Sequence, residues 1–117
     1  MQPETRDPAY VWDMLDAAKT VVVILSGKTK GDWDNDIVLR MAVECGIEIV
    51  GEAARRVSKI FTSQHPEIPW GDIIGQRNIL IHEYGRINYD QLYITATQDI
   101  PKLIDRLLPL LPPVEED

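Results

Sequence analysis

An arginine and a histidine, five positions apart, are the residues of this chain best suited to chemistry. Arg77 falls on the apolar side of a helix expected from about 72 to 84, where an unpaired charge is very costly. Its guanidinium must therefore meet a carboxylate (Glu48 or Glu52 could supply one), a solvated cleft or an anionic ligand. A histidine side chain ordinarily titrates near pH ~6.5, so His82 could transfer protons near neutrality while Arg77 stabilises negative charge.

A strip of small and polar residues occupies another side of the same helix. Its members follow one another at steps of four and three, namely Gly71, Gly75, Asn78, His82 and Gly85. A glycine inside a helix costs about 1 kcal/mol relative to alanine, so the strip indicates close approach of a partner helix or a ligand. A lone histidine is more often structural than catalytic, and its place on this strip raises the odds of a functional role.

The spacing of Arg77 and His82 sets a geometric condition. Five residues of a straight helix separate the two side chains by ~140° around its axis. Either the helix unwinds before His82, or a two-fold dimer brings residues of both chains to one cleft. The helix expected from about 35 to 61 favours a homodimer, because it has two apolar stripes. The first comprises Ile37, Val38, Met41, Cys45 and Ile49, and the second comprises Leu39, Val43, Val50, Ala54, Val57 and Phe61.

Periodicity and capping signals predict an all-α protein, an antiparallel bundle of four or five helices in a single domain spanning 1–117. No strand is predicted, and residues 112–117 are expected to form a flexible tail. The first helix is expected to be capped by Asp7 and ended by Gly27, followed by a polar turn over 28–34, and a loop is expected over 62–71. Asn88 can cap the last segment, and Pro101 is expected to kink or break it, after which Asp99 could cap it again.

Composition excludes several classes of protein. The chain has 117 residues, 12 basic and 19 acidic, with a net charge of -7, which argues against a generic nucleic-acid coat protein. A single cysteine, Cys45, excludes an internal disulfide framework, and its place in an apolar stripe predicts packing. Two histidines and one cysteine are too few for an ordinary structural zinc site, and no metal or cofactor is expected. No apolar run is long enough to cross a membrane, and a cytoplasmic setting is expected.

Residues 77–84 read Arg-Asn-Ile-Leu-Ile-His-Glu-Tyr, the pattern R-x4-H-x-Y. This pattern resembles the signature of HepT-like toxins, members of the HEPN superfamily of small helical ribonucleases. The flanking segments at residues 6–7, 51–54 and 65–70 also resemble that family. The similarity covers essentially the whole chain.

The resemblance implies a dimeric bundle with its active cleft at the subunit interface, cleaving RNA without a metal. It implies the toxin of a type VII toxin–antitoxin system, encoded beside a minimal, MntA-like nucleotidyltransferase antitoxin. That antitoxin silences the toxin by transferring AMP to the motif tyrosine. By matching positions, catalysis falls to Arg77 and His82, a supporting role to Asn78, and modification to Tyr84.

The acidic net charge is the main argument against an RNA-cleaving enzyme, since RNA is itself an anion. One alternative is a non-catalytic adaptor of the HEPN type, which binds nucleotides or positions a substrate for a partner nucleotidyltransferase. Another is a purely structural dimer, in which Arg77 forms an ion pair and His82 is a packing residue.

Overall fold

The computed structural model describes residues 6–111, which are helical almost throughout and include no strand. The predicted all-α class is therefore confirmed, while the predicted tail at 112–117 lies outside the described residues. The main helices are α1 (Asp7–Leu25), α2 (Lys30–Asn35), α3 (Ile37–Arg56), α4 (Lys59–Gln64), α5 (Trp70–His82), α6 (Tyr89–Ile94) and α7 (Ile100–Leu107). Shorter turns follow α5 (η2, Tyr84–Arg86), α6 (η3, Thr95–Asp99) and α7 (η4, Leu108–Leu110).

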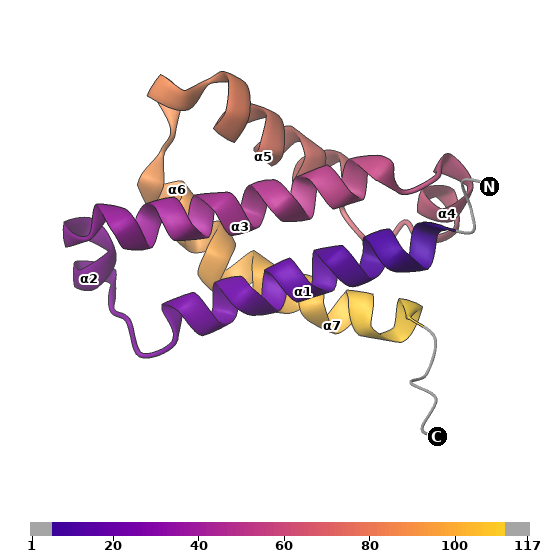
Figure 1. Ribbon diagram of the computed structural model, residues 1–117, viewed down its shortest axis with the longest axis horizontal. Coiled ribbons are helices and arrows are strands. Elements are labelled where there is room, and N and C mark those ends of the chain that lie inside the picture. The colour runs from indigo at the N-terminus through magenta and orange to yellow at the C-terminus, as the bar shows by residue number, and fades with distance from the viewer. Residues whose placement is uncertain (1–5, 112–117) are drawn as a thin grey trace.

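Helices α1 and α3 form the centre of the bundle. They run antiparallel, with α7 alongside α1 and α5 on the opposite side of α3 (Figure 1). The two central helices approach closely at Gly46, where an added Cβ would lie 2.5 Å from Cγ2 of Val21. Their facing sides carry a continuous aliphatic core, whose burial supplies the main favourable term in folding.

The helix predicted from 35 to 61 is divided in two by the structure. Asp36 caps α3, accepting hydrogen bonds from the backbone N–H groups of Val38 and Leu39. The helix ends at Arg56, and Ser58 then caps α4. The break coincides with a buried contact of Asp7, whose carboxylate accepts hydrogen bonds from the Ser58 N–H (2.8 Å) and hydroxyl (2.6 Å).

The prediction that Asp7 caps the first helix is therefore wrong. Its side chain instead joins the start of α1 to the start of α4. The predicted polar turn at 28–34 was also partly wrong. Thr29 and Asp32 form a reciprocal capping box that starts α2. This short helix carries the buried Trp33, whose indole N–H donates to the Tyr89 carbonyl.

The loop predicted over 62–71 is shorter than expected, because α4 continues to Gln64 and α5 already begins at Trp70. Asn88 caps α6 as predicted, accepting from the N–H of Gln91. Pro101 does not break the last segment, which runs through the π-helical turn η3 directly into α7. Such a turn accommodates the missing proline N–H without ending the helix, and the Asp99 side chain makes no capping hydrogen bond.

None of the helices within residues 6–111 has the combined length and apolar character needed to cross a membrane.

Candidate functional site

Helix α5 carries most of the predicted site and lies at the outside of the bundle, packed mainly against α3 (Figure 1). Gly51 of α3 makes this contact possible, because a Cβ there would overlap the Cβ of Arg77 and lie 3.2 Å from the Ile73 carbonyl oxygen. Among the described residues, no neighbouring helix of the same chain approaches the glycine strip, so close approach of a helix from a second chain or of a ligand stays a prediction. Added Cβ atoms at Gly71, Gly75 and Gly85 would meet no atom within 4 Å.

The Arg77 side chain is largely buried, with 18% of its surface exposed. Its Nη2 lies 2.9 Å from Oε2 of Glu52, and its Nη1 donates to Oδ1 of Asn78 at 3.0 Å. The third nitrogen, Nε, is buried and has no hydrogen-bond partner within the described part of the chain. The sequence thus identified the carboxylate partner correctly as one of two candidates, and the structure selects Glu52.

Glu52 is shared among three arginines. Besides Arg77, it accepts hydrogen bonds from Arg55 (2.9 Å) and Arg56 (3.0 Å). The hydrogen bonds from Arg55 and Arg56, helped by the nearby charge of Arg77, lower the pKa of Glu52 from 4.5 to about 2. The carboxylate is therefore ionised at neutral pH, and three positive charges around one negative charge leave this cluster with a net charge of +2.

A second feature of α3 limits where an anion can approach this cluster. Glu44, Glu48 and Glu52 follow one another at intervals of one helical turn. Glu44 is only 5% exposed, and its Oε1 has no partner among residues 6–111. Burial, followed by the charge of Glu44, raises the pKa of Glu48. The carboxyl groups of Glu44 and Glu48 disfavour an anion at their end of α3. A phosphate is therefore favoured near the end of α3 where Arg55 and Arg56 are exposed.

His82 is exposed in the last turn of α5, which remains helical from Arg77 through His82. Unwinding before His82, one of the two predicted ways to bring the residues together, is therefore wrong. On a regular helix the two Cα atoms are separated by about 7.5 Å along the axis and ~140° around it. Within one chain Arg77 contacts Asn78 and Glu52, whereas His82 lies on a different side of the helix. Tyr84 begins the short turn η2, immediately beyond α5.

The two apolar stripes of α3 have different environments. Most of the second stripe, including Leu39, Val43 and Val50, is buried in the core. The first stripe is exposed: the exposed fraction of its aliphatic residues ranges from 49% for Met41 to 71% for Val38. Cys45, predicted to pack, is exposed on this stripe in the single chain. Such a row of exposed aliphatic side chains is typical of an interaction surface.

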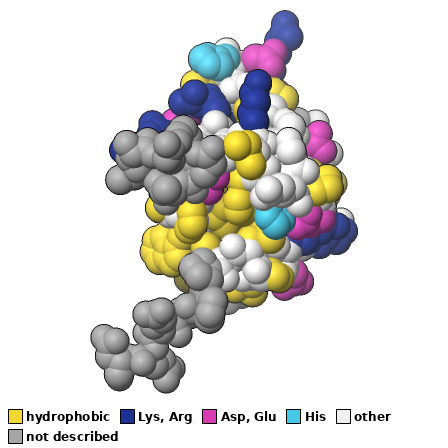
Figure 2. Space-filling view, turned by 90° about the vertical axis from the view of Figure 1, so that its right-hand side faces the viewer, with side chains coloured by type: hydrophobic (Ala, Val, Ile, Leu, Met, Phe, Trp, Pro, Cys, Tyr) yellow, Lys and Arg dark blue, Asp and Glu magenta, His cyan; other side chains and the backbone are white. Residues whose placement is uncertain are grey.

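Figure 2 shows the end of the molecule where α4 lies, with basic side chains in several separate groups and acidic side chains among them. An anion that approaches this end of the molecule therefore meets separate basic groups rather than one continuous basic surface. Within residues 6–111 no group of three or more His, Cys, Asp or Glu side chains is arranged to hold a metal ion.

The contact at Gly51 yields a first prediction. Gly51→Ala should lower the melting temperature, because overpacking a tight contact typically costs about 1–3 kcal/mol. Gly75→Ala is the matched control, since its added methyl group meets open space and removes a helix-destabilising glycine. Thermal unfolding followed by circular dichroism distinguishes them, and equal melting temperatures would contradict the close contact.

Comparison with known proteins identifies a matching family, described as "Ribonuclease HepT-like", over residues 14–109. A candidate RNase of Methanocaldococcus jannaschii is 35% identical over 95 residues, which cover 81% of this chain and 87% of the relative. A candidate RNase of Caldanaerobacter subterraneus subsp. tengcongensis is 34% identical over 80% of this chain and 84% of its own. A chain of Thermococcus cleftensis named "Probable ribonuclease HepT" is 32% identical over 80% of this chain and 86% of the relative. No solved structure matches.

Proposed function

Because this chain belongs to the HepT-like ribonuclease family of the HEPN superfamily, we propose that it is a metal-independent endoribonuclease and the toxin of a toxin–antitoxin pair. The observation that supports this most directly is the arginine cluster around Glu52. It gathers three guanidinium groups around one carboxylate at the position of the R-x4-H-x-Y motif, and those of Arg55 and Arg56 are exposed. A phosphodiester is the anion that such a planar donor recognises well.

The proposed reaction is an attack of the ribose 2′-hydroxyl on the adjacent phosphorus. A base takes the hydroxyl proton, the new P–O2′ bond forms, and the P–O5′ bond breaks. An acid gives a proton to the leaving 5′-oxygen, leaving a 2′,3′-cyclic phosphate on the other fragment. Arg77 stabilises the negative charge that accumulates on the phosphoryl oxygens, and Asn78 holds the guanidinium in place. His82 serves as either the acid or the base.

The proposal includes a homodimer, because α5 leaves Arg77 and His82 of one chain on different sides of the helix. A two-fold axis could place His82 of one subunit beside Arg77 of the other. The exposed stripe of α3, from Ile37 to Ile49, provides an apolar face for this contact. The site would then be complete only in the dimer.

Tyr84 is the proposed point of control by a minimal nucleotidyltransferase. Its hydroxyl would attack the α-phosphorus of ATP, giving an O-adenylyl tyrosine and releasing pyrophosphate. The added phosphate carries a negative charge seven residues beyond Arg77, where it would compete with the substrate. The toxin, the nucleotidyltransferase and the RNA are proposed to meet in the cytoplasm.

An assay of the purified chain tests the function. Incubation with single-stranded RNA in the presence of EDTA should produce fragments ending in a 2′,3′-cyclic phosphate, identified by mass spectrometry. Pre-incubation with the neighbouring nucleotidyltransferase and ATP should add AMP to Tyr84 and abolish cleavage, while Tyr84→Phe should escape modification. AMP on another residue, or cleavage only with added metal, would contradict the proposal.

A second candidate is a non-catalytic adaptor that binds nucleotides for a partner nucleotidyltransferase. The finding that favours it is the ion pair of Arg77 with Glu52, which gives the arginine a structural role. This reading predicts binding of AMP or RNA without cleavage under any condition of the same assay.

A further inference from the structure

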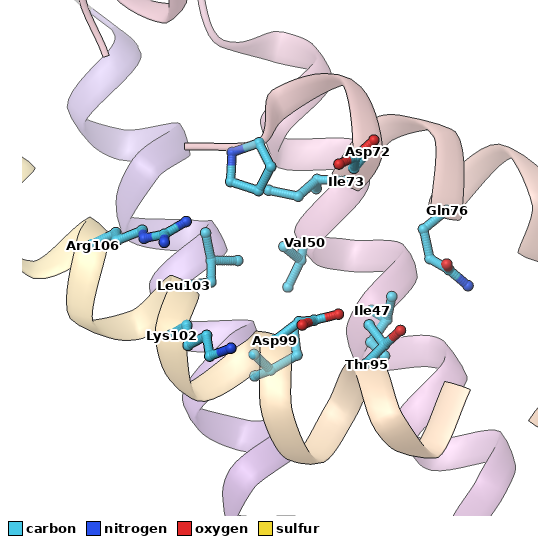
Figure 3. Close-up of a pocket in the computed structure, with 12 residues that line it drawn as sticks. Ile47, Val50, Asp72, Ile73, Gln76, Thr95, Asp99, Lys102, Leu103 and Arg106 are labelled. Atoms are coloured by element: carbon cyan, nitrogen blue, oxygen red, sulfur yellow. The ribbon is translucent and has the colours of Figure 1, made fainter. Parts of the chain in front are cut away.

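A pocket of about 250 Å³ lies on the flank of α5 that faces η3 and α7 (Figure 3). Val50 of α3, Ile73 of α5 and Leu103 of α7 are among the aliphatic side chains that line it. Gln76 and Asp72 reach it from the same helix that carries Arg77. Arg77 itself does not line the pocket, so the pocket is separate from the arginine cluster around Glu52.

The pocket is bordered by two acidic and two basic side chains, Asp72, Asp99, Lys102 and Arg106. Asp99 and Lys102 extend into it side by side from the α7 side, and Asp72 lies across from them (Figure 3). No ion pair within 4.0 Å involves any of these four in the described part of the chain. Arg106 is held by one hydrogen bond to the Glu67 carbonyl, at 3.2 Å. Carboxylates and cations are thus both available to a ligand.

These features restrict the ligand to a compact molecule. The pocket is slightly smaller than the ~300–1,000 Å³ typical of sites for drug-sized ligands. The aliphatic floor suits a flat or apolar body, the carboxylates require hydrogen-bond donors, and the cations require an anion. A nucleotide combines all three, since a base offers a flat body and N–H donors and its phosphate is anionic.

Among bases, guanine fits a carboxylate best. Its ring N–H and exocyclic amino group are adjacent donors on one edge, and both oxygens of an aspartate can accept from them. Single-stranded RNA is recognised in this way, through the edges of unstacked bases. Uracil presents only one N–H on the same edge, flanked by carbonyl groups that the carboxylate would repel.

We propose that this pocket binds one nucleotide of the single-stranded RNA substrate, with the base on the aliphatic floor, its N–H edge at Asp99 and its phosphate at Lys102 and Arg106. The inference rests on the proposed ribonuclease function and adds a subsite that selects the sequence, with guanine preferred. Because an α-helix is only about 10–12 Å across, RNA crossing α5 could occupy this pocket and reach the Arg77 cluster.

The test combines mononucleotide binding with RNA cleavage, using the full chain. GMP and UMP are titrated by NMR, following the methyl resonances of Val50 and Leu103. Cleavage rates are measured on two oligonucleotides that differ by one guanine or uracil. Lys102→Gln should weaken GMP binding and raise KM for RNA about tenfold with little change in kcat, the usual size for a lost charge-assisted hydrogen bond. Asp99→Asn should remove the preference for guanine.

Two exposed residues outside the pocket provide matched controls. Lys59→Gln removes a lysine from α4, and Asp105→Asn removes an aspartate from α7, without touching the lining. GMP binding that depends on Lys102, in a chain that cleaves no RNA, would support the pocket and refute the ribonuclease. Cleavage with an unchanged KM in Lys102→Gln would refute the RNA subsite, whether the pocket binds free nucleotides, the antitoxin or nothing.

Discussion

His82→Ala is expected to lower the rate of RNA cleavage by about 10²–10⁴-fold, the usual contribution of a positioned acid or base. The substitution should leave the fold intact, because His82 is exposed in the last turn of α5 and makes no contact that holds the core. Initial cleavage rates of a fluorescent RNA, with circular dichroism of both proteins, provide the measurement.

The other histidine is the natural control for this substitution. His65 lies before α5, against the Phe61 ring and 3.2 Å from Glu67, and is not part of the motif. His65→Ala should therefore cleave RNA at close to the rate of the chain without substitutions. Full activity in His82→Ala would remove the histidine from the mechanism and favour the adaptor.

Arg77→Ala is expected to lower kcat by about 10²–10³-fold, as measured for the loss of one transition-state donor in other enzymes. Arg77→Lys should recover only part of this loss, because an ammonium keeps the charge without the planar, bidentate donor. Stability should change less than activity, since Glu52 keeps its hydrogen bonds to Arg55 and Arg56. A large fall in melting temperature with little change in kcat would instead identify a structural ion pair.

The stability that the Glu52 carboxylate contributes has a predictable pH dependence. Because the pKa of Glu52 is lowered to about 2 in the folded chain, its ion pairs contribute stability that is fully present above its ordinary value of 4.5. That contribution decreases as pH falls from 4.5 toward 2. The difference in melting temperature between the chain without substitutions and Glu52→Gln, which removes the titrating carboxylate, should therefore be constant from pH 6 to 8 and shrink below pH 4.5.

Mixing the two inactive proteins tests whether one cleft uses both subunits. A heterodimer of Arg77→Ala with His82→Ala retains one intact Arg77 and one intact His82, on different chains. If the cleft joins residues of two chains, random mixing should restore about a quarter of the activity, since half of the dimers carry one intact site of two. No recovery in a mixture shown to contain heterodimers would place both residues in the same subunit's site.

Helical class, the apolar faces and the motif were predictable because each depends on residues close in sequence. The periodicity of α1 and α3, the cap at Asn88 and the R-x4-H-x-Y spacing are local signals. Predictions failed where a distant contact competed with local chemistry. Asp7 looks like a helix cap, but its carboxylate binds Ser58, which lies 51 residues away.

The residues of the site also divide into those that the sequence predicted and those that only the folded chain brings together. Sequence alone named Arg77 and two carboxylates that could pair with it, because a guanidinium on an apolar face must have a partner. Gly51 was the missed signal for the helix contact, since a single glycine in a helix does not reveal which neighbour it admits. Similarly, no sequence pattern connects Asp72 of α5 with Lys102 of α7, which line one pocket only after the chain folds.

The helical class, the family motif and the residues able to do its chemistry follow from the sequence alone, because they depend on side-chain type and local spacing. The pairing of Arg77 with Glu52, the unbroken helix through His82 and the exposed stripe of α3 became visible in the folded chain. Each of them depends on how α3 and α5 pack, and packing brings together residues that no local pattern relates.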